Sequence, residues 1–286
     1  MMYDNHNPLP WYSSLEEQAH RRNYAYGEIY PLYSPYDRLL PFQLTRRHLT
    51  TIAQWSATLV SMADGTQTDI TQYITGSAGF MIVEGSVQDT IVYSPLTGWS
   101  WSMLEGRYYA VLTDGQNVWY SEVFTAVNYL KDYLRISWRC MYDQPVGNGA
   151  ILYDSLPMPY NNVLYFAAEL GKPEYNFEEE GENRDGYFFA EKQVSTKTYK
   201  FFINAPEYLC DCLRLVRMAD YVKITDGYGN EYQCDTFLMT PTWGEQGDLA
   251  RVAIEFTTGT IVAKKVGLGY HNTGDFNNDF NNDFNT

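Results

Sequence analysis

One pattern runs through most of the chain: apolar and polar residues alternate over short segments, and a turn follows each segment. In residues 133–142, for example, every second residue is apolar and most of the others are polar. Alternation with a period of two is what a strand with one buried face requires. Such segments recur at intervals of about 8–12 residues, which is typical of β-sandwiches. The sequence therefore predicts a mainly β fold with sandwich-like domains.

The clearest hairpin signal lies near the middle of the chain. Two alternating segments, residues 108–112 and 118–124, flank the pair Asp114 and Gly115. Asp-Gly between alternating segments favours a tight turn, because glycine adopts positive φ without steric cost. We expect these two segments to pair as antiparallel strands.

The strongest helical pattern covers residues 206–219. Pro206 suits the first turn, and Asn204 or Ala205 is expected to cap it. A shorter helix is predicted from Ser13 or Ser14 to His20, with the serine as its cap and Glu16 or Glu17 near the third helical position. The apolar residues of the longer segment fall at helical spacing on one stripe: Leu209, Cys212, Leu213, Val216 and Ala219.

Changes in composition divide the chain into four parts. Residues 1–43 are rich in Tyr and Pro and are expected to form an extended arm, because proline blocks helix continuation. Residues 44–155 are expected to form a β-sandwich domain. Residues 156–268 are expected to form a second, β-rich α+β domain with one packed amphipathic helix. Residues 269–286 repeat Asp, Phe and Asn and cannot build a core.

Both ends of the chain offer aromatic rings for docking onto other chains. The tail resembles the start of a calcium loop, but Phe280 occupies the glycine position of that motif, so docking is favoured over metal binding. The candidate docking residues are Tyr24, Tyr26, Tyr30, Tyr33 and Tyr36 in the N-terminal segment and Phe276, Phe280 and Phe284 in the C-terminal tail.

Charge and composition argue against several classes of protein. The net charge is −15, which disfavours binding of nucleic acid through a basic patch. No run of about 18 apolar residues suggests a membrane span, and the first residues do not resemble a secretion signal. The 4 cysteines suit a reducing cytoplasm and are expected to be core thiols rather than zinc ligands.

No catalytic motif is recognisable, and we expect neither an enzyme, a metal site nor a cofactor. An acidic cluster could hold a glycosidase acid and base or a hard cation, but consecutive glutamates are expected to lie in a solvated polar loop. Trp99 and Trp101 could line a glycan site, although a core or subunit interface is favoured for them. The acidic cluster comprises Glu174, Glu178, Glu179, Glu180, Glu182 and Asp185.

Several runs resemble structural proteins of tail or neck assemblies in bacteriophages that infect gut Bacteroidetes, including the crAss-like phages. The resemblance implies a β-rich virion protein, made in the host cytoplasm, that assembles as a ring or hub in the tail. It implies other copies of itself and other tail, portal or neck proteins as partners, and it brings no catalytic residues. The runs are residues 106–124, 174–201, 205–213 and 243–256.

Two other functions stay open at this point. A carbohydrate- or receptor-binding module would use exposed aromatic residues such as Trp99 and Trp101. A glycoside hydrolase would need a matched pair of carboxylates in one cleft. The sequence favours a structural tail hub or adaptor, because a folded acidic body with adhesive ends suits an assembly subunit.

Overall fold

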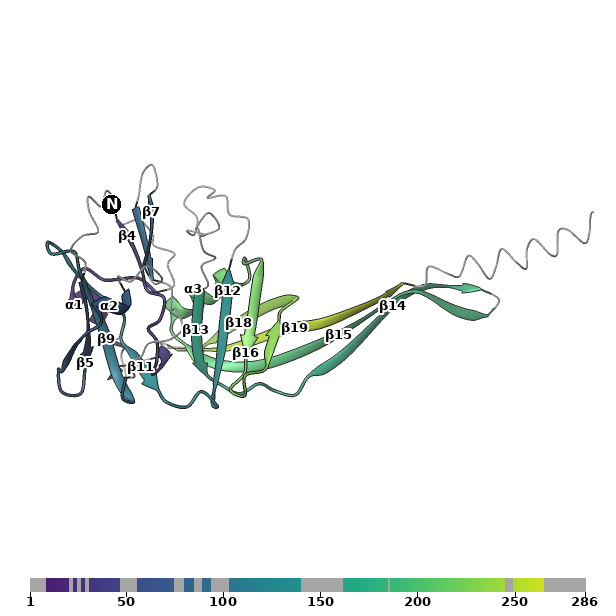
Figure 1. Ribbon diagram of the computed structural model, residues 1–286. Coiled ribbons are helices and arrows are strands. Elements are labelled where there is room, and N and C mark those ends of the chain that lie inside the picture. The colour runs from purple at the N-terminus through teal and green to yellow at the C-terminus, as the bar shows by residue number, and fades with distance from the viewer. Residues whose placement is uncertain are drawn as a thin grey trace, which may run out of the picture.

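A computed structural model describes residues 9–20, 23–24, 27–28, 31–46, 56–74, 80–84, 89–93, 103–139, 162–184, 186–244 and 249–264. Strands dominate this part of the chain, which confirms the predicted mainly β, sandwich-like fold. Figure 1 shows a body of several sheets from which a long, narrow β-arm projects. The arm is formed by strands β14, β15 and β19.

The first large sheet lies at the end of the body away from the arm (Figure 1). Its strand order is β3-β11-β9-β5-β6, with β10 paired to β9, and β3 and β11 run parallel. The strands are β3 (Tyr33–Pro35), β5 (Ser56–Ser61), β6 (Gln67–Asp69), β9 (Gly106–Thr113), β10 (Val118–Tyr120) and β11 (Phe124–Val127).

The hairpin predicted around Asp114 and Gly115 is confirmed, since β9 and β10 pair antiparallel across this turn. Gly115 has φ of 86°, the left-handed conformation that glycine adopts most easily. The second segment is shorter than expected, because the strand ends at Tyr120 and a new strand begins at Phe124. In between, the buried Ser121 hydroxyl accepts a hydrogen bond from the Ala110 backbone N–H, which replaces a regular ladder bond.

A second sheet, of order β13-β12-β16-β17, lies in the middle of the body. The alternation predicted from residue 133 onward is confirmed: Leu134, Ile136 and Trp138 are buried, whereas Cys140 lies outside the described residues. The strands are β12 (Tyr133–Arg139), β13 (Asn162–Ala167), β16 (Tyr221–Thr225) and β17 (Glu231–Gln233).

The third large sheet belongs to both the body and the arm. Its order is β14-β15-β19-β18, and every pairing is antiparallel. Beside these long strands, two small sheets pair β1 with β2 and β4 with β8 and β7. The large sheet contains β14 (Glu174–Arg184), β15 (Tyr187–Ala205), β18 (Thr236–Trp243) and β19 (Ala250–Lys264). The small sheets contain β1 (Asn23–Tyr24), β2 (Gly27–Glu28), β4 (Gln43–Arg46), β7 (Phe80–Glu84) and β8 (Asp89–Tyr93).

Helices are short within the described residues. Helix α1 (Leu15–His20) begins as predicted, because the Ser14 hydroxyl accepts a hydrogen bond from the Glu17 N–H at 3.1 Å. Helix α2 (Thr71–Ile74) is a single turn. Helix α3 (Glu207–Val216) ends before Ala219, and Pro206 is its N-cap residue. The expected cap at Asn204 or Ala205 is therefore wrong, since β15 continues through Ala205.

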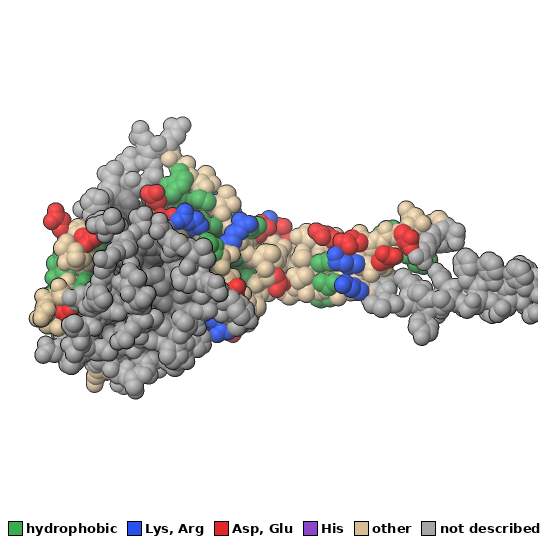
Figure 2. Space-filling model, turned by 90° about the horizontal axis from the view of Figure 1, so that it is seen from above, with side chains coloured by type: hydrophobic (Ala, Val, Ile, Leu, Met, Phe, Trp, Pro, Cys, Tyr) green, Lys and Arg blue, Asp and Glu red, His purple; other side chains and the backbone are tan. Residues whose placement is uncertain are grey.

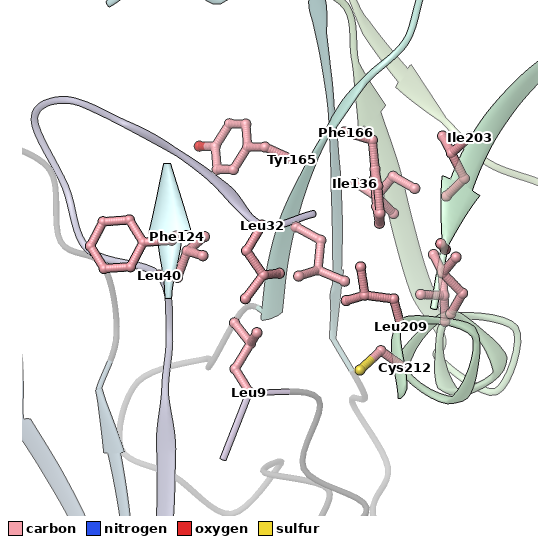
Figure 3. Packing of buried hydrophobic residues seen from close by; sticks show 14 of the residues in the cluster. Leu9, Leu32, Leu40, Phe124, Ile136, Tyr165, Phe166, Ile203, Leu209 and Cys212 are labelled. Carbon is pink, nitrogen blue, oxygen red and sulfur yellow. The ribbon is translucent and has the colours of Figure 1, made fainter. Parts of the chain in front are cut away.

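Among the described residues, the hydrophobic core forms a continuous cluster that includes residues from both predicted domains. Figure 3 shows Leu9, Leu32 and Leu40 from the N-terminal segments on one side, and Leu209 of α3 on the other. Ile136 of β12 and Tyr165 and Phe166 of β13 lie between them, and the side chains of Tyr165 and Phe166 point in opposite directions. The N-terminal segments thus pack into the body of the same chain. The predicted boundary near residue 155 stays a prediction.

Candidate functional site

The projecting arm continues strands that also form the core. In the body, Phe201 of β15 and Ile254 of β19 pair across the ladder, and both are buried. Toward the tip, the same two strands leave the body together with β14, and beyond Lys192 the described residues of the arm are those of the β14–β15 hairpin. At about 3.3 Å per residue, residues 187–198 extend roughly 35 Å. The arm is long enough to reach a neighbouring molecule.

One face of the arm carries exposed apolar residues on its two outer strands, β14 and β19. Residues paired across antiparallel strands share a face, and this row consists of Phe177, Ser195 and Ile261. Tyr175, two residues before Phe177, lies on the same face. The exposed fractions are 61% for Tyr175, 74% for Phe177 and 67% for Ile261. We call these three residues the apolar strip.

The apolar strip is the outward continuation of the core face. Tyr175 pairs with Lys197, which lies two residues from Tyr199 on β15. Tyr199 stacks on Phe256 with ring centroids 5.4 Å apart, inside the core cluster. The face that is covered by the body at Tyr199 is therefore uncovered at Phe177, and in the arm the central strand β15 adds Lys197 and Ser195 to it.

The opposite face of the arm carries ion pairs. Lys200 Nζ lies 3.4 Å from a Glu174 carboxylate oxygen and 3.3 Å from one of Glu255, and Lys192 Nζ lies 2.9 Å from Glu180. Val262 lies on this face as well, since it pairs with Val194. Figure 2 shows basic and acidic side chains next to one another along the arm. The two faces of the arm thus differ in chemistry.

Glycines permit two irregularities in the arm. The register shifts between Glu180 and Gly181, where a Cβ on Gly181 would lie 1.9 Å from the Phe189 carbonyl oxygen. The register shifts again opposite Thr196, where Gly259 has φ of 60°. Bulges of this kind bend a strand and increase its twist. They also interrupt the regular ladder, which discourages indiscriminate pairing of exposed strand edges.

The acidic segment, which was expected to be a polar loop, is strand β14 instead. The prediction was wrong because the glutamates concealed an alternation, Glu-Tyr-Asn-Phe-Glu at residues 174–178, that has the period of a strand. The described acids are exposed and spread over the arm, and Glu179 lies on the apolar-strip face while Glu180 lies opposite. Asp185 lies outside the described residues.

The predicted docking residues are described only in part. Tyr33 packs on Tyr133 of the same chain with ring centroids 5.0 Å apart, and Tyr36 is exposed. Tyr24 belongs to β1, but its side chain is outside the description. The remaining candidates lie outside the described residues: Tyr26, Tyr30, Trp99, Trp101, Phe276, Phe280 and Phe284.

Two of the cysteines are core thiols. Cys210 and Cys212 are buried on α3, and Cys212 lies on the predicted apolar stripe. Burial raises the pKa of the Cys210 thiol to about 11 and that of Cys234 to about 12, so both are protonated at neutral pH. Within the described ranges, no group of His, Cys, Asp and Glu side chains is arranged to hold a metal ion.

Comparison of the sequence with protein-family models and with curated proteins finds no match. Among the helices of the described residues, none has the length and apolar character needed to cross a membrane.

Proposed function

We propose that this chain is a structural assembly subunit, a tail-hub or adaptor protein that forms a ring in a bacteriophage tail. The observation that carries the proposal is the projecting arm, which exposes a continuation of the core face. Contiguous exposed apolar residues on a folded protein mark interaction surfaces, because their burial is favourable. A chain of this shape serves assembly better than it serves chemistry on a small substrate.

Support for the phage context comes from sequence. Two of the runs that resemble phage tail and neck proteins, residues 174–201 and 243–256, form β14, most of β15 and part of β19. The arm and its base thus coincide with the resemblance. As a virion protein the chain would contact further copies of itself and other tail, portal or neck proteins.

Native mass spectrometry of the full-length protein, alone and with the other structural proteins of the particle, tests this function. We expect a ring or another higher oligomer, or a defined complex with a virion protein. A monomer at concentrations of tens of micromolar that also binds no virion protein would contradict the proposal. Cryo-electron microscopy of intact particles gives a second readout, because the arm and body together have a distinctive outline (Figure 1).

A further inference from the structure

We infer that the apolar strip of the arm is covered by the body of a second copy of this chain, in a head-to-tail contact that repeats around the ring. This inference rests on the proposed assembly function and names the partner and the surfaces that meet. The strip itself is Tyr175, Phe177 and Ile261, described above.

The body carries a second exposed apolar surface, which we call the body patch and which consists of Tyr129, Leu130 and Tyr228. Tyr129 is 80% exposed and Tyr228 is 75% exposed. Tyr129 and Leu130 lie in the loop between β11 and β12, and Tyr228 lies in the turn between β16 and β17. Neither loop belongs to the arm.

The two loops of the body patch contact one another. Lys131 Nζ lies 5.6 Å from the centre of the Tyr228 ring. A Cβ on Gly227 would lie 2.0 Å from the Lys131 carbonyl oxygen, so only glycine permits this approach. Asp226 accepts hydrogen bonds from the N–H groups of Tyr228 and Asn230, which fixes the turn. The two loops that carry the patch are therefore adjacent, and hydrogen bonds hold the Tyr228 turn in place.

Charges next to the two surfaces are complementary. On the arm, Lys197 lies beside Tyr175, and Glu179 lies two residues beyond Phe177 on the same face. On the body, exposed Lys131 and Asp132 directly follow the apolar residues of the patch. A contact between strip and patch can therefore pair Glu179 with Lys131 and Lys197 with Asp132. Opposite charges at the rim favour the correct orientation and exclude wrong partners.

The alternative partner for the strip within a homo-oligomer is the arm of another copy. Two arms packed strip against strip would bring together two β14 strands, each with Glu179 on the packed face. Like charges at short distance oppose such a pairing. The edge of the body patch offers Lys131 to Glu179 and Asp132 to Lys197, so the charges favour it as the partner.

A contact between two different surfaces is heterologous, and it repeats from copy to copy until a ring closes. Each copy then supplies one arm and one body patch, and both apolar surfaces are buried in every copy. The arm and the patch belong to different parts of the molecule, which is the arrangement that such a contact requires (Figure 1).

The test uses two double variants of the full-length protein and a control. The arm variant is Phe177→Thr with Ile261→Thr, and the body variant is Tyr129→Ser with Tyr228→Ser. All four side chains are exposed in the single chain, so the fold should be retained, which circular dichroism and the unfolding midpoint will verify. Leu104→Ser, at an exposed residue outside both surfaces, is the matched control.

Analytical ultracentrifugation and native mass spectrometry then report self-association. We expect each double variant to self-associate about a hundredfold more weakly than the unmodified protein, because truncation of a hot-spot residue at the centre of an interface costs about a factor of ten or more. An equimolar mixture of the two variants should form a dimer and nothing larger, because one intact strip meets one intact patch. The control should assemble normally.

Three outcomes would overturn the inference, and they differ from failure of the proposed function. If the arm variant still forms the oligomer, the strip is not the contact. If the body variant assembles while the arm variant does not, two arms pair with one another or the arm binds elsewhere. If the mixture remains monomeric, strip and patch do not meet. In each case the unmodified protein still assembles, whereas failure of the proposed function leaves the unmodified protein monomeric and without a virion partner.

Discussion

The inner and outer halves of the sheet that β14, β15 and β19 form carry apolar residues on the same face but have opposite surroundings. In the body, the row of Phe201 and Ile254 is 2% and 0% exposed, whereas in the arm Ile261 is 67% exposed. Both rows lie on one face of one sheet. The difference shows that alternation specifies a face with an apolar surface, but the neighbouring elements decide whether that face is buried. In the inner half α3 and the adjacent sheets cover it.

The largest expected effect is a difference between the two halves in how much a Phe→Ala substitution lowers the free energy of unfolding. Phe201→Ala removes a buried ring and should lower the free energy of unfolding by about 3–5 kcal/mol. Phe177→Ala, the same substitution in the arm, should change it by about 0.5 kcal/mol or less, because the ring is exposed in the single chain. Urea unfolding of monomeric protein measures both values. Equal losses would show that the arm is part of the stable core.

A second, smaller effect concerns the integrity of the arm itself. In Gly181→Ala the new methyl group would clash with the Phe189 carbonyl, which should cost about 1–3 kcal/mol of local stability at the hairpin. Hydrogen exchange should become faster in residues 178–192 and stay unchanged in β12 and β16. Gly106→Ala in β9 is the control, since its Cβ would meet its nearest neighbour at an ordinary 3.6 Å. Faster exchange throughout the body would argue against an independent arm.

The smallest expected effect is a loss of stability at low pH through Asp226, which lies in the turn of the body patch. Burial alone would raise the pKa of Asp226, but hydrogen bonds from Asn230, Tyr228 and Tyr232 lower it overall. Because the pKa is lower in the folded than in the unfolded chain, the carboxylate stabilises the fold above about pH 4. This contribution is lost as the pH falls through the folded value.

Urea midpoints recorded between pH 7 and pH 3 measure this dependence. Asp226→Asn should be less stable than the unmodified protein at neutral pH, and the difference should shrink below about pH 4. A difference that stays constant over the whole range would mean that the hydrogen bonds to the carboxylate do not depend on its charge.

The sequence reveals local structure better than it reveals surroundings. The Asp114–Gly115 turn, the alternation of Leu134, Ile136 and Trp138 and the cap of α1 are confirmed, because short-range sterics and hydrogen bonding determine them. The cap of α3 was misplaced, since β15 runs directly into the helix and pairs with β19 up to Ala205.

The candidate site was only partly predictable. Aromatic rings for docking were expected at the two ends of the chain, whereas the structure presents Tyr175 and Phe177 on an internal hairpin. Consecutive glutamates made this segment resemble a loop, because the alternation of polar and aromatic residues before them covers only residues 174–178. No sequence pattern distinguishes an apolar face that the same chain covers from one that another chain covers in the assembly. Whether a face is covered depends on tertiary packing, and the arm projects past the elements that cover the same face in the body.

Hydroxyl-radical footprinting of the isolated chain and of the assembled ring tests the central claim most directly. The rate of side-chain oxidation follows solvent exposure, and Tyr175, Phe177 and Tyr228 are exposed in the single chain. We expect all three to be strongly protected in the assembled ring, while Leu104 stays as reactive as before. Equal oxidation of the three rings in both states would contradict the account, since it would show that assembly leaves the strip and the patch uncovered.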